Sequence, residues 1–100
     1  MSELRPQVAA FAQLMEQKLR KHDDDRGTRG WSSMTPMDLC WRLDREVDEL
    51  KHSLCCLGAG SDLSDVAGEC ADVANFAMMI IDVLEQLENE DEDAQTPSSS

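Results

Sequence analysis

Two pairs of acidic residues, each with a spacing of three, are the feature of this chain that suggests chemistry. Glu46 and Glu49 lie in REVDEL, and Glu69 and Asp72 lie in GECADVANF. Residues three apart lie on one face of a helix, so each pair presents two carboxylates together. If the two helices run antiparallel and side by side, four carboxylates converge. Such a set of oxygen ligands suits Mg²⁺, with Mn²⁺ as a substitute.

The second pair is the more informative one, because its surroundings are apolar. Residues 70–81 are nearly all apolar or small, which is typical of a helix buried on most of its sides. Glu69, Asp72 and Asn75 recur in it at steps of three, and a buried carboxylate is costly unless it is paired or bound to a metal. The alternative is that the glutamates are surface residues in salt bridges with Arg42, Arg45 or Lys51. The presence of both pairs favours the metal site.

The elements that must position these residues are predicted to be helices. Apolar spacing predicts helices at residues 6–22 and 36–56, the second beginning at a Thr35 cap followed by Pro36. A polar loop, residues 22–31, lies between them. A third helix is expected to begin at a Ser61 or Ser64 cap and to run to about Leu87. The predicted fold class is therefore all-α, an antiparallel bundle of about three long helices.

Composition limits the size and partners of this bundle. The chain has 100 residues and only four aromatic side chains, so its core is small and we expect oligomerisation to complete it. We assign one domain to residues 1–88 and predict that residues 89–100, acidic and then rich in Ser and Thr, form a disordered tail. The net charge of −12 argues against nucleic acid and against an anionic membrane surface as partners.

The sequence also indicates a cellular compartment and a role for the cysteines. No secretory signal or membrane-spanning run is visible, so we expect a cytoplasmic protein. The four cysteines lack CxxC spacing, which favours reduced thiols over a structural zinc site. The residues concerned are Cys40, Cys55, Cys56 and Cys70.

With these motifs in place, the chain resembles a known family. EVDEL followed by ECADVANFAMMI is similar to the MazG-like branch of the all-α nucleoside triphosphate pyrophosphohydrolases, whose signature is ExxE, a spacer and ExxD. The segment KLRKHDDDRGTRGW resembles a subset found in phages and bacteria. The resemblance covers roughly residues 14–87.

The resemblance implies an enzyme and roles for its residues. The implied reaction is hydrolysis of a nucleoside or deoxynucleoside triphosphate to the monophosphate and pyrophosphate, with a lean toward deoxypurine triphosphates. Glu46, Glu49, Glu69 and Asp72 would bind Mg²⁺, Glu49 would also orient or deprotonate the attacking water, and Asn75 would contact the nucleotide. The family assembles as homodimers or homotetramers.

Several further residues are candidates for binding the substrate. Lys18 and Lys21, near the end of the first helix, and Arg29 in the loop would bind phosphates, although the lysines equally suit the C-terminus of a helix. Trp31 would either stack on a base or close the core beneath the loop. Trp41 is expected at packing or subunit contacts.

A second class of function competes with the enzyme. The same leucine-rich stripes and acidic tail suit a small helical dimer that acts as a non-catalytic adaptor or binding protein. The two hypotheses differ at the carboxylates, since an adaptor does not need Glu46.

Overall fold

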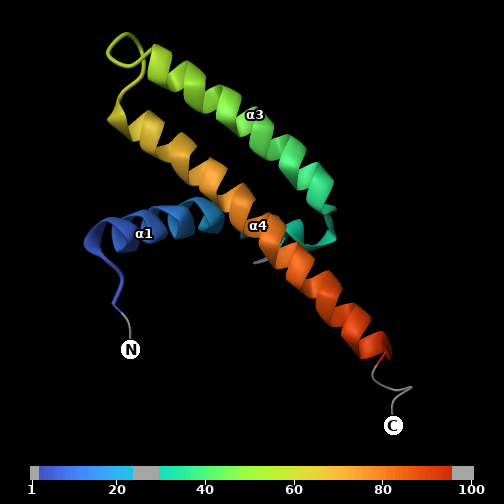
Figure 1. Ribbon diagram of the computed structural model, residues 1–100. Helices are drawn as coiled ribbons and strands as arrows, with labels where there is room; N and C mark the ends of the chain where they lie inside the picture. Colours follow the sequence, from blue (N-terminus) through green and yellow to red (C-terminus); the bar gives the residue numbers. More distant parts are fainter. Residues whose placement is uncertain (1–2, 24–29, 96–100) are drawn as a thin grey trace.

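The computed structural model describes residues 3–23 and 30–95, with side chains through residue 90, and it confirms the all-α class. Figure 1 shows the order of its elements. They are α1 (Pro6–Arg20), the short 3-10 helix η1 (Gly30–Ser33), α3 (Pro36–Cys55) and α4 (Leu63–Gln95). Within the described residues no β-strand forms, and the closest approach to one is an isolated bridge between Leu57 and Ser61.

Local sequence signals explain where the helices begin. Pro6 and Pro36 occupy the first turns of α1 and α3, where a missing N–H costs nothing. The Thr35 hydroxyl accepts a hydrogen bond from the backbone N–H of Asp38 at 3.1 Å, as the sequence predicts.

The cap of α4 differs from the prediction, because neither Ser61 nor Ser64 caps it. The backbone N–H of Asp65 donates to Asp62 Oδ1 at 3.0 Å, and the N–H of Asp62 donates to Asp65 Oδ2 at 2.9 Å. This is a reciprocal capping box, and two carboxylates at the positive end of the helix also favour it electrostatically. Asp62 therefore outcompetes its serine neighbours.

The far end of α4 also differs from the prediction. The helix continues past Leu87 to Gln95, so residues 89–95, predicted to belong to a disordered tail, are helical, while residues 96–100 lie outside the described residues. Extending an existing helix needs no new nucleus, and the segment contains good helix formers without Gly or Pro. The charge of the segment suggested disorder, but the helix that precedes it determined the outcome.

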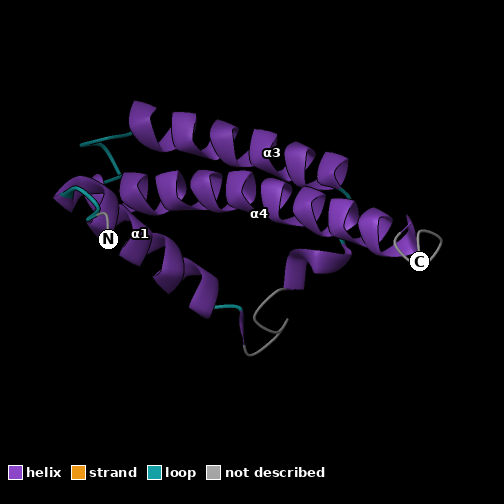
Figure 2. Ribbon diagram, turned by 60° about the horizontal axis from the view of Figure 1, so that its bottom comes forward, coloured by secondary structure: helices purple, strands orange, loops and turns teal. Residues whose placement is uncertain are grey.

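The helices are arranged around α4. Helices α3 and α4 form an antiparallel hairpin, and Figures 1 and 2 show α1 crossing α4 on the side away from α3. The hairpin loop turns at Gly58 and Gly60, whose φ angles of 86° and 119° are rarely accessible to other residues. Helices α1 and α3 both pack on α4, so residues 69–82 of α4 lie between these two helices.

The core of this arrangement is small. Among the described residues, only Leu39, Ala71 and Val83 are buried apolar side chains. The radius of gyration is 17.0 Å, against about 13 Å for a compact chain of this length. None of the described helices combines the length and the apolarity needed to cross a bilayer.

Candidate functional site

Three of the four predicted carboxylates converge between α3 and α4. Glu46 and Glu49 come from α3 and Glu69 comes from α4, and one carboxylate oxygen of each lies within 4.8 Å of the other two. The antiparallel hairpin produces this meeting, because it sets the middle of α3 against the first half of α4. We call these three residues the carboxylate cluster.

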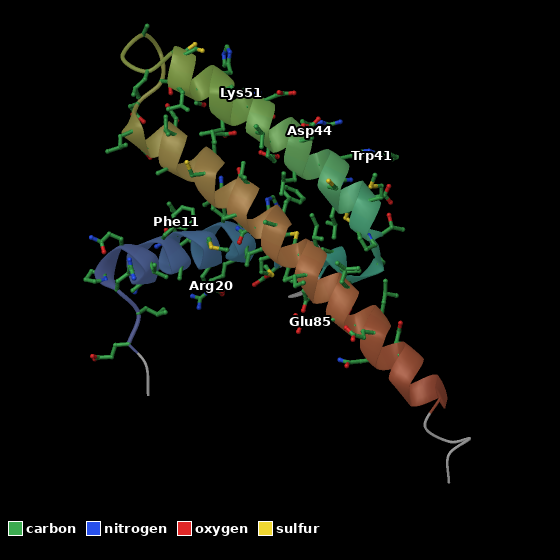
Figure 3. All side chains as sticks on the ribbon, in the orientation of Figure 1. Phe11, Arg20, Trp41, Asp44, Lys51 and Glu85 are labelled. Atoms are coloured by element: carbon green, nitrogen blue, oxygen red, sulfur yellow. The ribbon has the colours of Figure 1, made fainter. Side chains whose placement is uncertain are left out.

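The carboxylate cluster contains acceptor oxygens that the described residues leave without partners. Glu46 Oε2 and Glu69 Oε2 are both buried and receive no hydrogen bond from any of those residues. The ion pairs in the described part of the chain are Lys18–Asp72 and Arg20–Glu16, so none of the three cluster residues forms a salt bridge there. Figure 3 shows Lys51 on α3 on the side away from α4. Salt bridges with arginine or lysine therefore do not explain the cluster.

Proximity and burial change the acidity of the carboxylate cluster. Burial, followed by the hydrogen bond and negative charge of Glu49, raises the pKa of Glu46 from 4.5 to about 7, with smaller contributions from Asp72 and Glu69. Burial is also the largest cause of the raised pKa of Glu69, with Glu49 and Asp72 adding to it and the Lys18 ammonium opposing it. The site accumulates negative charge that the protein itself compensates poorly.

Asp72, the fourth predicted ligand, lies next to the carboxylate cluster and faces a cation. Its Oδ2 is 3.4 Å from Lys18 Nζ, and both side chains are about one-quarter exposed, at 27% and 25%. Asp72 still raises the pKa of Glu46 and Glu69 through its charge, so it is close to both. The structure thus places all four acidic residues in one region and brings three of them into mutual contact distance.

A cavity of about 300 Å³ adjoins this acidic region. Glu46 and Asp72 form part of its wall, which joins the cavity to the carboxylate cluster. The wall also contains cationic and polar side chains from α1, η1, α3 and α4, namely Lys18, Trp31, Arg42 and Asn75. Its apolar part consists of Leu19, Met34, Phe76 and Met79. The cavity therefore combines an acidic end with an apolar wall, and this combination suits a ligand with a charged and a planar part.

Asn75 and Trp31 are both oriented by hydrogen bonds to other elements. Asn75 is 3% exposed, and its Nδ2 donates to the carbonyl oxygen of Met15 at 3.1 Å. Its Oδ1 is buried without a partner among the described residues. Trp31 Nε1 donates to Asp82 Oδ2 at 2.9 Å.

The remaining predicted binding residues have different positions. Lys21 is exposed at the C-terminal cap of α1 and does not line the cavity, and Arg29 lies outside the described residues. Trp41 is 64% exposed on the outer side of α3, so it does not pack within the chain (Figure 3).

Sequence reasoning missed most of the cavity wall. It considered Arg42 only as a salt-bridge partner of the glutamates, although Arg42 lines the cavity one turn before Glu46. Phe76 and Met79 follow Asp72 at helical spacing, and this signal was available. Met34 becomes part of the wall only through the path of η1, which the sequence did not reveal.

The cysteines take no part in the carboxylate cluster or in this cavity. All four are free, with Cys40 and Cys55 exposed.

Comparison with protein-family models, with curated proteins and with solved structures finds no match to this chain. Any assignment of function is therefore a proposal that rests on the sequence motifs of this chain and on the geometry of its residues.

Proposed function

We propose that the protein is a Mg²⁺-dependent nucleoside triphosphate pyrophosphohydrolase. The observation that carries the proposal is the carboxylate cluster, whose buried Glu46 and Glu69 oxygens lack partners and which adjoins a cavity of about 300 Å³. Partnerless buried carboxylate oxygens cost free energy unless a cation binds them. The resemblance of the two acidic motifs to the MazG-like family supports the same activity.

The donor set fits a hard divalent cation. Glu46, Glu49 and Glu69 offer only carboxylate oxygens, which favour Mg²⁺ or Mn²⁺ over softer metals. Asp72, which is paired with Lys18 in this structure, would be the fourth carboxylate to hold the cation. When bound, Mg²⁺ supplies positive charge to the phosphate oxygens and lowers the pKa of water. This charge also lets a chain with a net charge of −12 hold an anionic substrate.

Different side chains have different proposed roles in the hydrolysis. Glu49 is the exposed member of the carboxylate cluster, so it is accessible to water and accepts a proton from it. The water oxygen bonds to the α-phosphorus while the bond from that phosphorus to the α–β bridging oxygen breaks, and pyrophosphate leaves. Lys18 and Arg42, both on the cavity wall, bind phosphate oxygens.

The rest of the cavity is proposed to hold the nucleoside. Its apolar wall suits a planar base. We extend the proposal to deoxypurine triphosphates on the resemblance to the family.

We also propose that the active form is a homodimer or homotetramer. The described part of a single chain buries only three apolar side chains, whereas Leu63, Ile81, Leu84 and Leu87 are exposed along α4. Covering these residues with a second copy supplies the missing core. Light scattering should then give a mass of two or four times 11.2 kDa, and a mass of 11.2 kDa would contradict the proposal.

The proposed compartment is the cytoplasm. All four cysteines are free, which agrees with a reducing environment. The proposed substrates are also intracellular metabolites.

The deciding experiment is a substrate panel. The protein is incubated with each of the eight common ribo- and deoxynucleoside triphosphates and Mg²⁺, and the products are separated by ion exchange. We expect monophosphate and pyrophosphate from a subset of the panel, lost with EDTA and in Glu49→Gln. Release of inorganic phosphate instead would contradict cleavage between the α- and β-phosphates. Absence of any turnover by folded, Mg²⁺-loaded protein would favour the adaptor function, which the exposed apolar residues of α4 also suit.

A further inference from the structure

The hydrogen bond between Trp31 and Asp82 joins two elements that lie far apart in the sequence. Trp31 lies in η1, and Asp82 lies on α4, 51 positions later. The donor–acceptor distance is 2.9 Å, and the bond is partly buried. A hydrogen bond to a charged acceptor in such a setting is stronger than one between neutral groups. Asp82 itself does not line the cavity, whereas Trp31 does.

This bond determines which part of the indole a ligand can use. Trp has a single polar hydrogen, the one on Nε1, and Asp82 accepts it. Toward the cavity the side chain therefore presents only its aromatic carbon surface. Aromatic surfaces bind planar rings by stacking, and the strength depends on how the two planes are oriented.

We propose that Asp82 is a positioning residue, which holds the Trp31 indole in the orientation that stacks on the base of the bound nucleotide. The proposal rests on the proposed function, because it takes a nucleotide as the ligand. Asp82 acts through the indole N–H and contributes no contact of its own to the ligand. The nucleotide then meets a ring whose orientation is set before binding, which reduces the entropy lost on binding.

The test is a double-mutant cycle on Trp31 and Asp82, in the full chain with Trp41→Phe as the common background. The chain has two tryptophans, so Trp31 alone then reports by fluorescence. Trp31→Phe keeps an aromatic ring and removes the N–H donor. Asp82→Leu removes the acceptor, and Asp82→Asn, the matched control, keeps an acceptor oxygen. Melting temperatures establish that each variant is folded.

Binding is measured by calorimetry with Mg²⁺ and two kinds of probe. The first is whichever of the four common deoxynucleoside monophosphates binds most tightly, and the second is deoxyribose 5-phosphate, which lacks a base. We expect Asp82→Leu to weaken the nucleotide about five- to tenfold, the effect of one hydrogen bond, and to leave deoxyribose 5-phosphate unchanged. Asp82→Asn, which keeps an acceptor oxygen but loses its charge, should weaken the nucleotide less than Asp82→Leu does. In the Trp31→Phe background, where the bond to the indole is already absent, Asp82→Leu should have a clearly smaller effect.

A readout without ligand tests the same bond. In the absence of nucleotide, acrylamide should quench Trp31 fluorescence more efficiently in Asp82→Leu than in the Trp41→Phe parent, because the ring is no longer held. Equal quenching in both proteins would contradict the positioning role.

Other outcomes distinguish this proposal from the proposed function. Equal weakening of both probes, or additive effects of Asp82→Leu and Trp31→Phe, would overturn the role of Asp82 even if the protein hydrolyses a triphosphate. Nucleotide binding with the expected coupling, but without turnover, would overturn hydrolysis and support the positioning role. Failure of the parent to bind any of the four nucleotides would overturn both.

Discussion

The two ends of the cavity solve the problem of buried polar groups in different ways. At one end, α3 and α4 bring Glu46, Glu49 and Glu69 together, and two of their buried oxygens receive no hydrogen bond from the described residues. At the other end, Asn75 and Trp31 each donate a hydrogen bond to a group on a different element. The first end collects like charges, and the second end satisfies its donors.

The fold itself supplies the hydrogen bonds of Asn75 and Trp31, whereas a bound cation must supply the positive charge that compensates the carboxylate cluster. The donors of Asn75 and Trp31 contribute to stability in the protein alone, because their bonds exist without a ligand. The carboxylate cluster opposes folding until a cation binds, since burial and mutual repulsion both disfavour its charged form. Loss of a residue should therefore affect stability in opposite directions at the two ends.

The largest expected effect is that of Glu46→Gln on activity and stability together. The substitution removes one carboxylate of the carboxylate cluster, so Mg²⁺-dependent turnover should fall roughly a hundredfold or more, because a bound metal contributes several kcal/mol to the transition state. In EDTA at pH 7.5 the melting temperature should rise, because repulsion is relieved. Steady-state kinetics and thermal melts measure the two effects.

The control is Asp48→Asn, which removes one negative charge from an exposed position of the same helix. It should leave turnover within about twofold and change stability by less than about 0.5 kcal/mol. A lower melting temperature for Glu46→Gln in EDTA would contradict the view that the carboxylate cluster opposes folding.

The helices and one half of the site follow from local patterns, which explains why the sequence predicted them. Apolar spacing and the Thr35–Pro36 start signal locate α3, and the acidic spacing of three places two carboxylates on one helical face. The antiparallel course of α3 and α4 then requires only a short turn, which the sequence marks with Gly58 and Gly60. Such features depend on residues close in sequence.

The features that the sequence did not predict depend on competition between neighbouring cap residues or on contacts between residues far apart in the sequence. Asp62 capped α4 in preference to the predicted serines because Asp65 returned its hydrogen bond. The pairing of Trp31 with Asp82 joins residues 51 positions apart, and no periodicity reports such a contact. The sequence also did not predict that Lys18 pairs with Asp72, since the crossing of α1 over α4 determines the distance between these two residues.

The second prediction concerns the hydrogen-bonded part of the cavity wall, where Asn75→Ala should destabilise the protein. The substitution removes the hydrogen bond to Met15 that ties α4 to α1 and leaves space among buried groups. We expect a loss of about 1–2 kcal/mol in the free energy of unfolding, with or without Mg²⁺. Urea denaturation measures it.

Asn89→Ala is the matched control, because Asn89 lies on the same helix and is exposed. Its effect should stay within about 0.5 kcal/mol. A destabilisation by Asn75→Ala that vanished on addition of Mg²⁺ would mean that the two ends of the cavity are not independent.

The third prediction is a pH dependence that belongs to the carboxylate cluster alone. The pKa of Glu46 is raised from 4.5 to about 7 in the folded protein, so between these values the native state binds more protons than the unfolded state. The contribution of Glu46 to stability is therefore complete below pH 4.5 and is lost as the pH rises through about 7. In EDTA the melting temperature should fall by several degrees between pH 5 and pH 7.5.

Two comparisons isolate the cause of this pH dependence. Mg²⁺ should restore the melting temperature at pH 7.5, because it takes the place of the proton. Glu46→Gln should make the profile in EDTA shallower and leave the part that Glu69 contributes. Asn75→Ala should shift the whole profile downward without changing its slope. A profile for Glu46→Gln as steep as that of the parent would assign the titration to other groups.

The smallest expected effect on stability comes from Lys18, which stands where the two ends of the cavity meet. Its ion pair with Asp72 is partly exposed, so Lys18→Met should change the free energy of unfolding by less than about 1 kcal/mol. Turnover should respond differently, because Lys18 is proposed to bind phosphate oxygens at the cavity wall. We expect KM for the triphosphate to rise more than kcat falls.

Arg20→Met provides the control, because its ion pair with Glu16 is more exposed and lies on the same helix, outside the cavity. It should alter neither stability nor KM measurably. Removal of Lys18 also takes away the charge that opposes the raised pKa of Glu69, so Mg²⁺ should compete less well with protons at pH 6. If Lys18→Met left KM and this pH dependence unchanged, Lys18 would serve only to neutralise Asp72. The cationic contribution to substrate binding would then fall to Arg42, which also lines the cavity.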